Sequence, residues 1–314
     1  MAAITKLLAI VIIVIISLPL MAIISDNDHG DNTLEVIVIA GQSNAAYRQA
    51  NTTIVNEDVP IPTTNVYYYG TSSQPIWYGY PSNPTYDDTF DSYGIYSMIS
   101  NGSWKIGGYE PVLAQSIGKE SNCDVLVINV GISSANINYL LPDQIGGTYV
   151  KNVIEDALSK VDNKYVVDKV GYVWIQGESD KTTSVSTYIE KFETINEWYH
   201  SNGFDTCYLV QTRPSDGGNA SMAQLKICQE DSSVILASTA PSTFTVSNGL
   251  IESDDLHYTQ RGRDIIGLDI DSKINLPYHL KESQGSEIIA ILPIMIIVMI
   301  ILATCKIYIG FKND

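Results

Sequence analysis

Three short strings in this chain carry side chains suited to hydrolysis. They are Gly41-Gln42-Ser43-Asn44, Gln176-Gly177-Glu178-Ser179-Asp180 and Asp254-Asp255-Leu256-His257. A serine hydroxyl is a weak nucleophile until a base removes its proton, and histidine, whose ordinary pKa is about 6.5, suits that task. An aspartate hydrogen-bonded to the far ring nitrogen holds such a histidine in the productive orientation. Together the strings supply a nucleophile, hydrogen-bond donors and an Asp/His pair.

The candidate catalytic residues are Ser43 as nucleophile, His257 as base and Asp254 as its orienting partner. Asp254 precedes His257 by three residues, a spacing at which one turn brings the carboxylate to the imidazole, with Asp255 as the alternative. The other histidines lack such a partner and are expected on the surface; they are His29, His200 and His279. A serine after a strand often only caps a turn. The presence of His257 therefore favours catalysis.

A developing oxyanion needs hydrogen-bond donors, and the chain offers three candidates. Ser43 and Gly131 each offer a backbone N–H in the turn after a strand, where such groups have no ladder partner. Gln176 offers its side-chain amide. Losing one donor of this kind typically costs about 10²- to 10³-fold in rate.

Residues beside these candidates are expected to hold the site in shape. They are Gln42, Asn44, Gly177 and Glu178. For Glu178 and Asp180, a role in holding these neighbours is favoured over direct acid catalysis. A glycosidase built on the two carboxylates would leave Ser43 and His257 without a function.

The elements that must position these residues follow an alternating pattern. Apolar, β-branched segments predict strands at residues 34–40, 124–130, 170–175 and 206–211, and helical patterns cover 111–120, 148–161, 185–202, 220–230 and a stretch from about 259. Alternation of this kind predicts an α/β domain with a central parallel sheet covered on both faces. Ligands bind outside the carboxyl ends of such strands, and Ser43, Gly131 and Gln176 each follow a strand end.

Residues 45–108 predict a long, loop-dominated insertion with one strand-like segment at 65–69. Loops of this length are usually functional. Its aromatic rings either stack on sugar faces or pack the loops onto the sheet; they are Tyr67, Tyr68, Tyr69, Trp77, Tyr78, Tyr80, Tyr86, Tyr93 and Tyr96.

Apolar runs at residues 7–24 and 288–305 are long enough to cross a membrane as helices. They divide the chain into a terminal anchor or cleaved signal segment (1–26), an exported domain (27–285) and a transmembrane helix with a short tail (286–314). The outer flanks carry Lys6, Lys306 and Lys312, which predicts that both termini are cytoplasmic.

Charge and cysteine content limit the partners. The net charge of −17 repels nucleic acid. No ligand cluster has metal spacing, so we expect neither a metal nor a cofactor. Cys207 and Cys228 are expected to lie close together, either as a disulfide or as two buried free thiols. The oligomeric state is not predicted.

The strings Val-Ile-Ala-Gly-Gln-Ser-Asn, Trp-Ile-Gln-Gly-Glu-Ser-Asp and Asp-Asp-Leu-His-Tyr, in this order, resemble the SGNH (GDSL-type) hydrolase superfamily. Within it they are similar to the sialate O-acetylesterase and acetylxylan esterase branch, carbohydrate esterase family six. The resemblance covers most of residues 34–276 and implies a flavodoxin-like three-layer α/β/α fold and a Ser/Asp/His triad. The Gln-Gly-Glu string, where the wider superfamily carries an Asn donor, favours carbohydrate esterases over lipases and thioesterases.

The expected function is that of a membrane-anchored, extracytoplasmic serine esterase that removes O-acetyl groups from glycans. Its activity should rise with pH as the catalytic histidine loses its proton. Two alternatives stay open. One is a glycan-binding or adhesion module that has kept the fold and lost turnover, and the other is a lipid or thioester hydrolase.

Overall fold

The computed structural model describes residues 32–46, 59–73 and 93–274. The apolar runs at 7–24 and 288–305 lie outside these ranges, so their membrane-spanning role stays a prediction. Within the described ranges, no helix combines the length and the apolar character that a membrane span needs.

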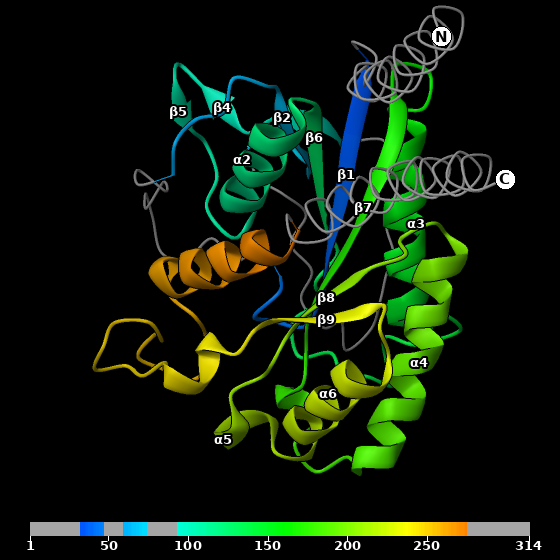
Figure 1. Cartoon of the computed structure of the whole chain (residues 1–314), viewed down its shortest axis with the longest axis vertical. Helices are drawn as coiled ribbons and strands as arrows, with labels where there is room; N and C mark the ends of the chain where they lie inside the picture. Colours follow the sequence, from blue (N-terminus) through cyan, green and yellow to red (C-terminus); the bar gives the residue numbers. More distant parts are fainter. Residues whose placement is uncertain (1–31, 47–58, 74–92, 275–314) are drawn as a thin grey trace, which may run out of the picture. The chain divides into compact units, whose positions relative to one another are not determined.

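A seven-stranded sheet forms the centre of the described part (Figure 1). Its strands are β1 (Thr33–Gly41), β2 (Val66–Gly70), β3 (Gly94–Ser97), β6 (Asp124–Asn129), β7 (Val166–Ile175), β8 (Cys207–Val210) and β9 (Val234–Ser238). Their order is β3-β2-β6-β1-β7-β8-β9, and all neighbours are parallel except β2 and β3. The chain starts at β1, places β6 on one side and continues with β7 on the other. The strand order therefore reverses between β1 and β7, where α/β proteins place their ligands.

Helices cover both faces of this sheet. They are α2 (Glu110–Ser121), α3 (Ile145–Ser159), α4 (Val185–Ser201), α5 (Pro214–Gly217), α6 (Asn219–Glu230) and a last described helix at 260–274, with 3-10 turns η2 (Glu178–Asp180) and η3 (Ala240–Thr243). In Figure 1, α3 and α4 lie on one side, and α2 and the orange last helix lie on the other. Each face of the sheet has its own hydrophobic core. Val36 and Val38 of β1 pack into the core on the side of α3 and α4, and Ile37 and Ile39 pack into the core on the side of α2. Burial on both faces explains why β1 is continuously apolar from Val36 to Ala40.

The predicted α/β class with a mostly parallel sheet is confirmed. The four predicted strands are present, although β7 starts at Val166 rather than at 170, because Val166–Lys169 pair with Thr33–Val36 of β1. The structure also contains elements that the sequence pattern does not predict: β9, the short α5, β3, and the hairpin of β4 (Ile99–Ser100) and β5 (Ser103–Trp104).

The insertion contributes to the sheet as well as to loops. Its described parts contain β2 and β3, which extend the sheet at one edge, and the hairpin of β4 and β5. Tyr68 and Tyr69 of β2 are fully buried and enter opposite cores, so these two rings pack the fold and do not face a sugar. Four of the nine aromatic candidates lie outside the described residues: Trp77, Tyr78, Tyr80 and Tyr86.

The expected disulfide between Cys207 and Cys228 is not formed in the structure. Cys207 on β8 is buried and Cys228 on α6 is partly buried, and both are free thiols. Burial raises the pKa of both thiols, that of Cys228 to about 12, which keeps them unreactive at neutral pH. The alternative of two free cysteines describes this pair.

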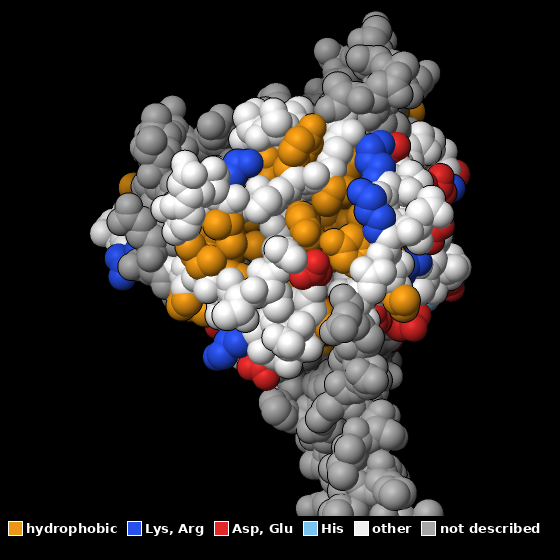
Figure 2. All heavy atoms as spheres, turned by 90° about the horizontal axis from the view of Figure 1, so that it is seen from above, with side chains coloured by type: hydrophobic (Ala, Val, Ile, Leu, Met, Phe, Trp, Pro, Cys, Tyr) orange, Lys and Arg blue, Asp and Glu red, His pale blue; other side chains and the backbone are white. Residues whose placement is uncertain are grey.

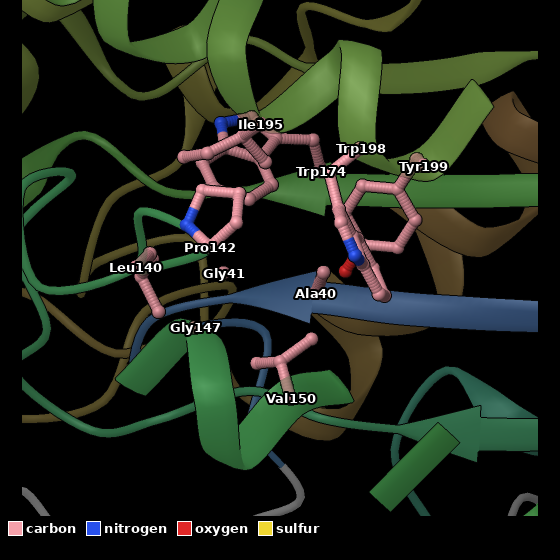
Figure 3. Close-up of a pocket in the computed structure, with 10 residues that line it drawn as sticks. All are labelled: Ala40, Gly41, Leu140, Pro142, Gly147, Val150, Trp174, Ile195, Trp198 and Tyr199. Carbon is pink, nitrogen blue, oxygen red and sulfur yellow. The ribbon is translucent and has the colours of Figure 1, made fainter. Parts of the chain in front are cut away.

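A small void lies between β1, β7 and the helices α3 and α4. Figure 3 shows its lining, in which Trp174 and Tyr199 face Ala40 and Val150 across the gap. Its volume is only about 10 Å³. Because such a space holds at most one water molecule, it is a packing defect and not a substrate site.

Candidate active site

A tight turn at residues 42–46, here called the nucleophile turn, presents Ser43 at the end of β1. Gly41 makes this turn possible, because its φ is +135° and a Cβ there would lie 1.9 Å from the Ile175 carbonyl oxygen. The carbonyl oxygen of Gln42 accepts hydrogen bonds from the N–H groups of Ala45 (2.9 Å) and Ala46 (2.8 Å). The chain therefore leaves the sheet abruptly, directly at the switch point between β1 and β7.

Ser43 and His257 line the same open cleft, which has a volume of about 320 Å³. Ser43 is 7% exposed, so it reaches the cleft from a mostly buried position. The lining is largely polar and includes Ser134, Lys181 and Asp216. Figure 2 shows one face of the molecule, on which hydrophobic patches lie beside basic side chains.

Asp254 and His257 form the expected pair. The Asp254 carboxylate lies 2.5 Å from Nδ1 of His257, and its other oxygen accepts the N–H groups of His257 (3.0 Å) and Leu256 (3.1 Å). Partial burial raises the pKa of Asp254, but these hydrogen bonds outweigh it and lower the pKa to about 2. The carboxylate therefore stays charged at any physiological pH. It holds the His257 ring through Nδ1, so that Nε2 does not contact Asp254.

No hydrogen bond joins Ser43 to His257 within the described residues. Catalytic hydrogen bonds are often long in hydrolases without substrate and tighten only in the complex. The alternative partner, Asp255, points elsewhere: its side chain and its carbonyl oxygen both accept from the Arg213 guanidinium. Arg213 also donates to the Phe244 carbonyl and pairs with Asp216, so it ties the end of β8 to the loop that carries His257.

Asn44 connects all three strings. Its side-chain amide donates to Oε1 of Glu178 (2.6 Å) and to the Leu256 carbonyl (3.3 Å), and its Oδ1 accepts the N–H of Tyr258 (3.1 Å). Burial raises the pKa of Glu178, although the bond from Asn44 works in the opposite direction. The residue next to the nucleophile thus sets the position of the histidine loop.

Gln42 is the second junction, and Gln176 is buried behind it. Oε1 of Gln42 accepts from the Gln176 amide (3.2 Å), from the Gly177 N–H (3.3 Å) and from the Ser179 N–H (3.1 Å). Gln176 is 0% exposed, and its amide also donates to Asp180 (2.5 Å). This placement corrects the interpretation of Gln176 as an oxyanion donor: its amide is used inside the protein, where it joins the second string to the first.

Gly131 also differs from the expectation. Its N–H donates to Oδ1 of Asn129 (3.0 Å) and so is already bound. A Cβ at Gly131 would lie 2.4 Å from the Ala46 nitrogen, which shows how closely this loop approaches the nucleophile turn. Of the three expected oxyanion donors, only the Ser43 N–H has no acceptor within the described residues.

Several residues that contact the site were missed from sequence. Asn129 is the polar residue that follows the apolar run 125–128 of β6, a signal that was available. Tyr109, Arg213 and Arg263 carry no such signal, because only the fold shows that Tyr109 and Arg263 are buried, and Arg213 partly buried, beside the turns of the site. Groups of three or more metal-ligating side chains are absent from the ranges that the structure covers.

The comparisons with known proteins identify the fold. No protein-family model and no curated protein sequence matches the chain. Among solved structures, the crystal structure of NanS matches with a TM-score of 0.51 at 13% identity, over 80% of this chain and 99% of that one. A protein from Arabidopsis thaliana matches with a TM-score of 0.48 at 17% identity, over 76% and 97%. A carbohydrate acetylesterase from Xanthomonas citri matches with a TM-score of 0.43 at 12% identity, over 75% of this chain and 54% of that one.

These likenesses concern the fold. The described part of the chain shares the α/β fold of the NanS structure.

Proposed function

We propose that this protein is a serine esterase that removes O-acetyl groups from carbohydrates through an acetyl-enzyme. The observation that carries the proposal is the cleft at the switch point, where Ser43 lies with His257, whose ring is oriented by Asp254. The polar lining of this cleft suits a hydroxyl-rich substrate better than an acyl chain. The Gln-Gly-Glu string supports the same choice by its resemblance to carbohydrate esterases.

In the first step, the Ser43 hydroxyl oxygen attacks the acetyl carbonyl carbon and His257 Nε2 takes the hydroxyl proton. The carbonyl oxygen gains negative charge and rests on the Ser43 N–H. The bond to the sugar oxygen then breaks, and that oxygen receives the proton from His257. The products are the free sugar hydroxyl and Ser43 carrying an acetyl group.

In the second step, a water molecule attacks the acetyl-enzyme. His257 takes a proton from the water, the second tetrahedral intermediate forms on the same donor, and Ser43 leaves with the proton returned to its oxygen. Acetate is released. Throughout, Asp254 stabilises the charged ring without itself taking the proton.

The test is hydrolysis of p-nitrophenyl acetate by residues 27–285, followed by a panel of acetylated sugars and a chain-length series of esters. We expect turnover by the wild type and a loss of about 10³-fold or more in Ser43→Ala, since nucleophile removal in serine hydrolases has effects of this size. Equal rates for the two proteins would rule out the assignment. A preference for long acyl chains would indicate a lipid hydrolase, and binding on a glycan array without turnover would indicate a binding module.

The place of action is part of the proposal. The apolar runs at 7–24 and 288–305, with lysines on their outer flanks, support a protein anchored in a membrane with its esterase domain on the extracytoplasmic side.

A further inference from the structure

Three successive carbonyl groups of the nucleophile turn are held from inside the protein. The bonds run from the Tyr109 hydroxyl to the Asn44 oxygen (3.0 Å), from the Asn129 amide to the Ala45 oxygen (3.0 Å), and from the Arg263 guanidinium to the Ala46 oxygen (3.5 Å). We call the three donors the clamp residues. None of them lines the cleft.

The clamp residues come from three separate elements. Tyr109 immediately precedes α2, Asn129 ends β6, and Arg263 lies in the last described helix. They are 0%, 2% and 2% exposed, respectively. Burying three polar side chains is costly unless they are hydrogen-bonded. Apolar side chains at these positions would fill the core equally well. The polar side chains are therefore explained by the carbonyl groups of the turn to which they donate.

Each clamp residue is itself fixed. The Asn129 amide also donates to Oε1 of Glu110 (3.0 Å), and its Oδ1 accepts the Gly131 N–H (3.0 Å). The Arg263 guanidinium lies 5.7 Å from the centre of the Tyr109 ring and donates to the Tyr258 carbonyl (3.3 Å), next to the catalytic histidine. The clamp therefore links the turn to both neighbouring loops of the site.

The direction of the Ser43 N–H follows from this arrangement. In a trans peptide the N–H and C=O groups point in opposite directions. The N–H groups of Ala45 and Ala46 hold the carbonyl group of Gln42, which shares a peptide plane with the Ser43 N–H. Since the clamp fixes the carbonyl groups of residues 44–46, it also fixes these N–H groups and, through them, the plane that aims the Ser43 N–H.

We propose that Tyr109, Asn129 and Arg263 are positioning residues that hold Ser43 and its N–H in the geometry needed for attack and oxyanion binding. This inference rests on the esterase function proposed above. Without the clamp, the turn still forms, but the hydroxyl and the N–H lose their fixed relation to each other and to His257.

Tyr109→Phe tests the proposal with the smallest change, because it removes one hydroxyl and keeps the ring against Arg263. Its matched control is Tyr172→Phe, which removes an equally buried hydroxyl that donates to Asn196 (2.7 Å) on the α4 side of the sheet. Both proteins should unfold at similar, slightly lower temperatures than the wild type. For Tyr109→Phe we expect kcat on p-nitrophenyl acetate to fall about 10- to 100-fold with KM little changed, since misplacements on the order of 1 Å can cost about 100-fold.

A second readout follows acylation directly. The rate at which a fluorophosphonate probe labels Ser43 should fall in Tyr109→Phe and stay at the wild-type value in Tyr172→Phe. Arg263→Lys keeps the charge, and its labelling rate should lie between those of the wild type and Tyr109→Phe. A lysine ammonium lacks the planar fork of donors that the guanidinium offers.

The outcomes separate this inference from the proposed function. An active wild type, an inactive Ser43→Ala and a Tyr109→Phe variant as fast as wild type, or slowed no more than Tyr172→Phe, would overturn the clamp and leave the esterase intact. A wild type that neither turns over the ester nor reacts with the probe would overturn both.

Discussion

At the scale of single residues, the Asp254 carboxylate decides whether His257 works as a base. Three hydrogen bonds converge on it, and they keep its pKa at about 2. Its charge is therefore constant over the pH range in which an esterase works. The charge of Asp254 therefore does not account for the rise of activity with pH that the sequence predicts.

The Asp254→Asn variant should lower kcat by about 10³- to 10⁴-fold, since an amide favours the wrong histidine tautomer in such triads. Asp255→Asn is the matched control, because it makes the same change one residue later, where φ is +54° and asparagine is tolerated. We expect that control to lose much less activity. Similar losses in the two variants, measured as kcat on p-nitrophenyl acetate, would contradict the assignment of Asp254.

Glu110 is a second residue with a consequence that can be measured. It is fully buried, and burial raises its pKa from 4.5 to about 7 against the opposing effects of the Asn129 hydrogen bond and the Arg263 charge. In the unfolded chain the carboxyl loses its proton near pH 4.5, whereas the folded state keeps it to about pH 7. Between these values the folded protein binds more protons, so this group makes the free energy of unfolding fall as pH rises.

The Glu110→Gln variant should remove that dependence. Between about pH 4.5 and pH 7, the free energy of unfolding of the variant should rise relative to that of the wild type by on the order of 3 kcal/mol. Each unit of pKa shift corresponds to about 1.4 kcal/mol. Urea unfolding at several pH values measures it, with the exposed Glu197→Gln as control. A difference between wild type and variant that is independent of pH would show that Glu110 titrates normally.

At the scale of elements, the site depends on loops that approach from separate strands. Asn44 and Gln42 hold the second and third strings to the end of β1. Arg213, just after β8, holds the third string through Asp255 and also donates to the Phe244 carbonyl at the end of η3. Such loops are fixed mainly by side-chain hydrogen bonds, so the loss of one donor moves a catalytic residue without unfolding the sheet.

Arg213→Lys should show this separation. Lysine keeps the charge but does not bind Asp255, Asp216 and Phe244 together, because its ammonium group is a point charge on a flexible stem. We expect roughly a 10-fold loss of kcat, below the about 100-fold effect of a full misplacement on the order of 1 Å, and a small change in melting temperature. Arg261→Lys, at an exposed position of the last helix, is the control. A full loss of folding would instead assign Arg213 to the core.

At the scale of the whole molecule, the sequence predicted what depends on local pattern. The apolar strands with their polar ends placed Ser43 and Gln176 at one edge of the sheet, and the spacing of Asp254 and His257 predicted their contact. What it did not predict depends on contacts distant in sequence. The Gln176 amide turns inward because Asp180 and Gln42 accept its hydrogen bonds, and Tyr109 and Arg263 reach the nucleophile turn from the start of α2 and from the last described helix, both far from it in sequence.

Membrane attachment is the remaining prediction at this scale, and it depends on the runs at 7–24 and 288–305, which lie outside the described residues. A span of about 20 apolar residues inserts in an effectively irreversible manner. The full chain should therefore stay with membranes through alkaline carbonate extraction, whereas residues 27–285 should be soluble and active. Protease added outside intact cells should digest the esterase domain, because both termini are expected in the cytoplasm.

Removal of residues 286–314 alone distinguishes the two interpretations of the first run. An uncut anchor keeps this shortened chain in the membrane, and a cleaved signal releases it. Either result is compatible with an extracytoplasmic esterase, because export is common to both. A full chain that carbonate extracts completely, or an esterase domain that resists external protease until the cells are opened, would contradict the proposed location.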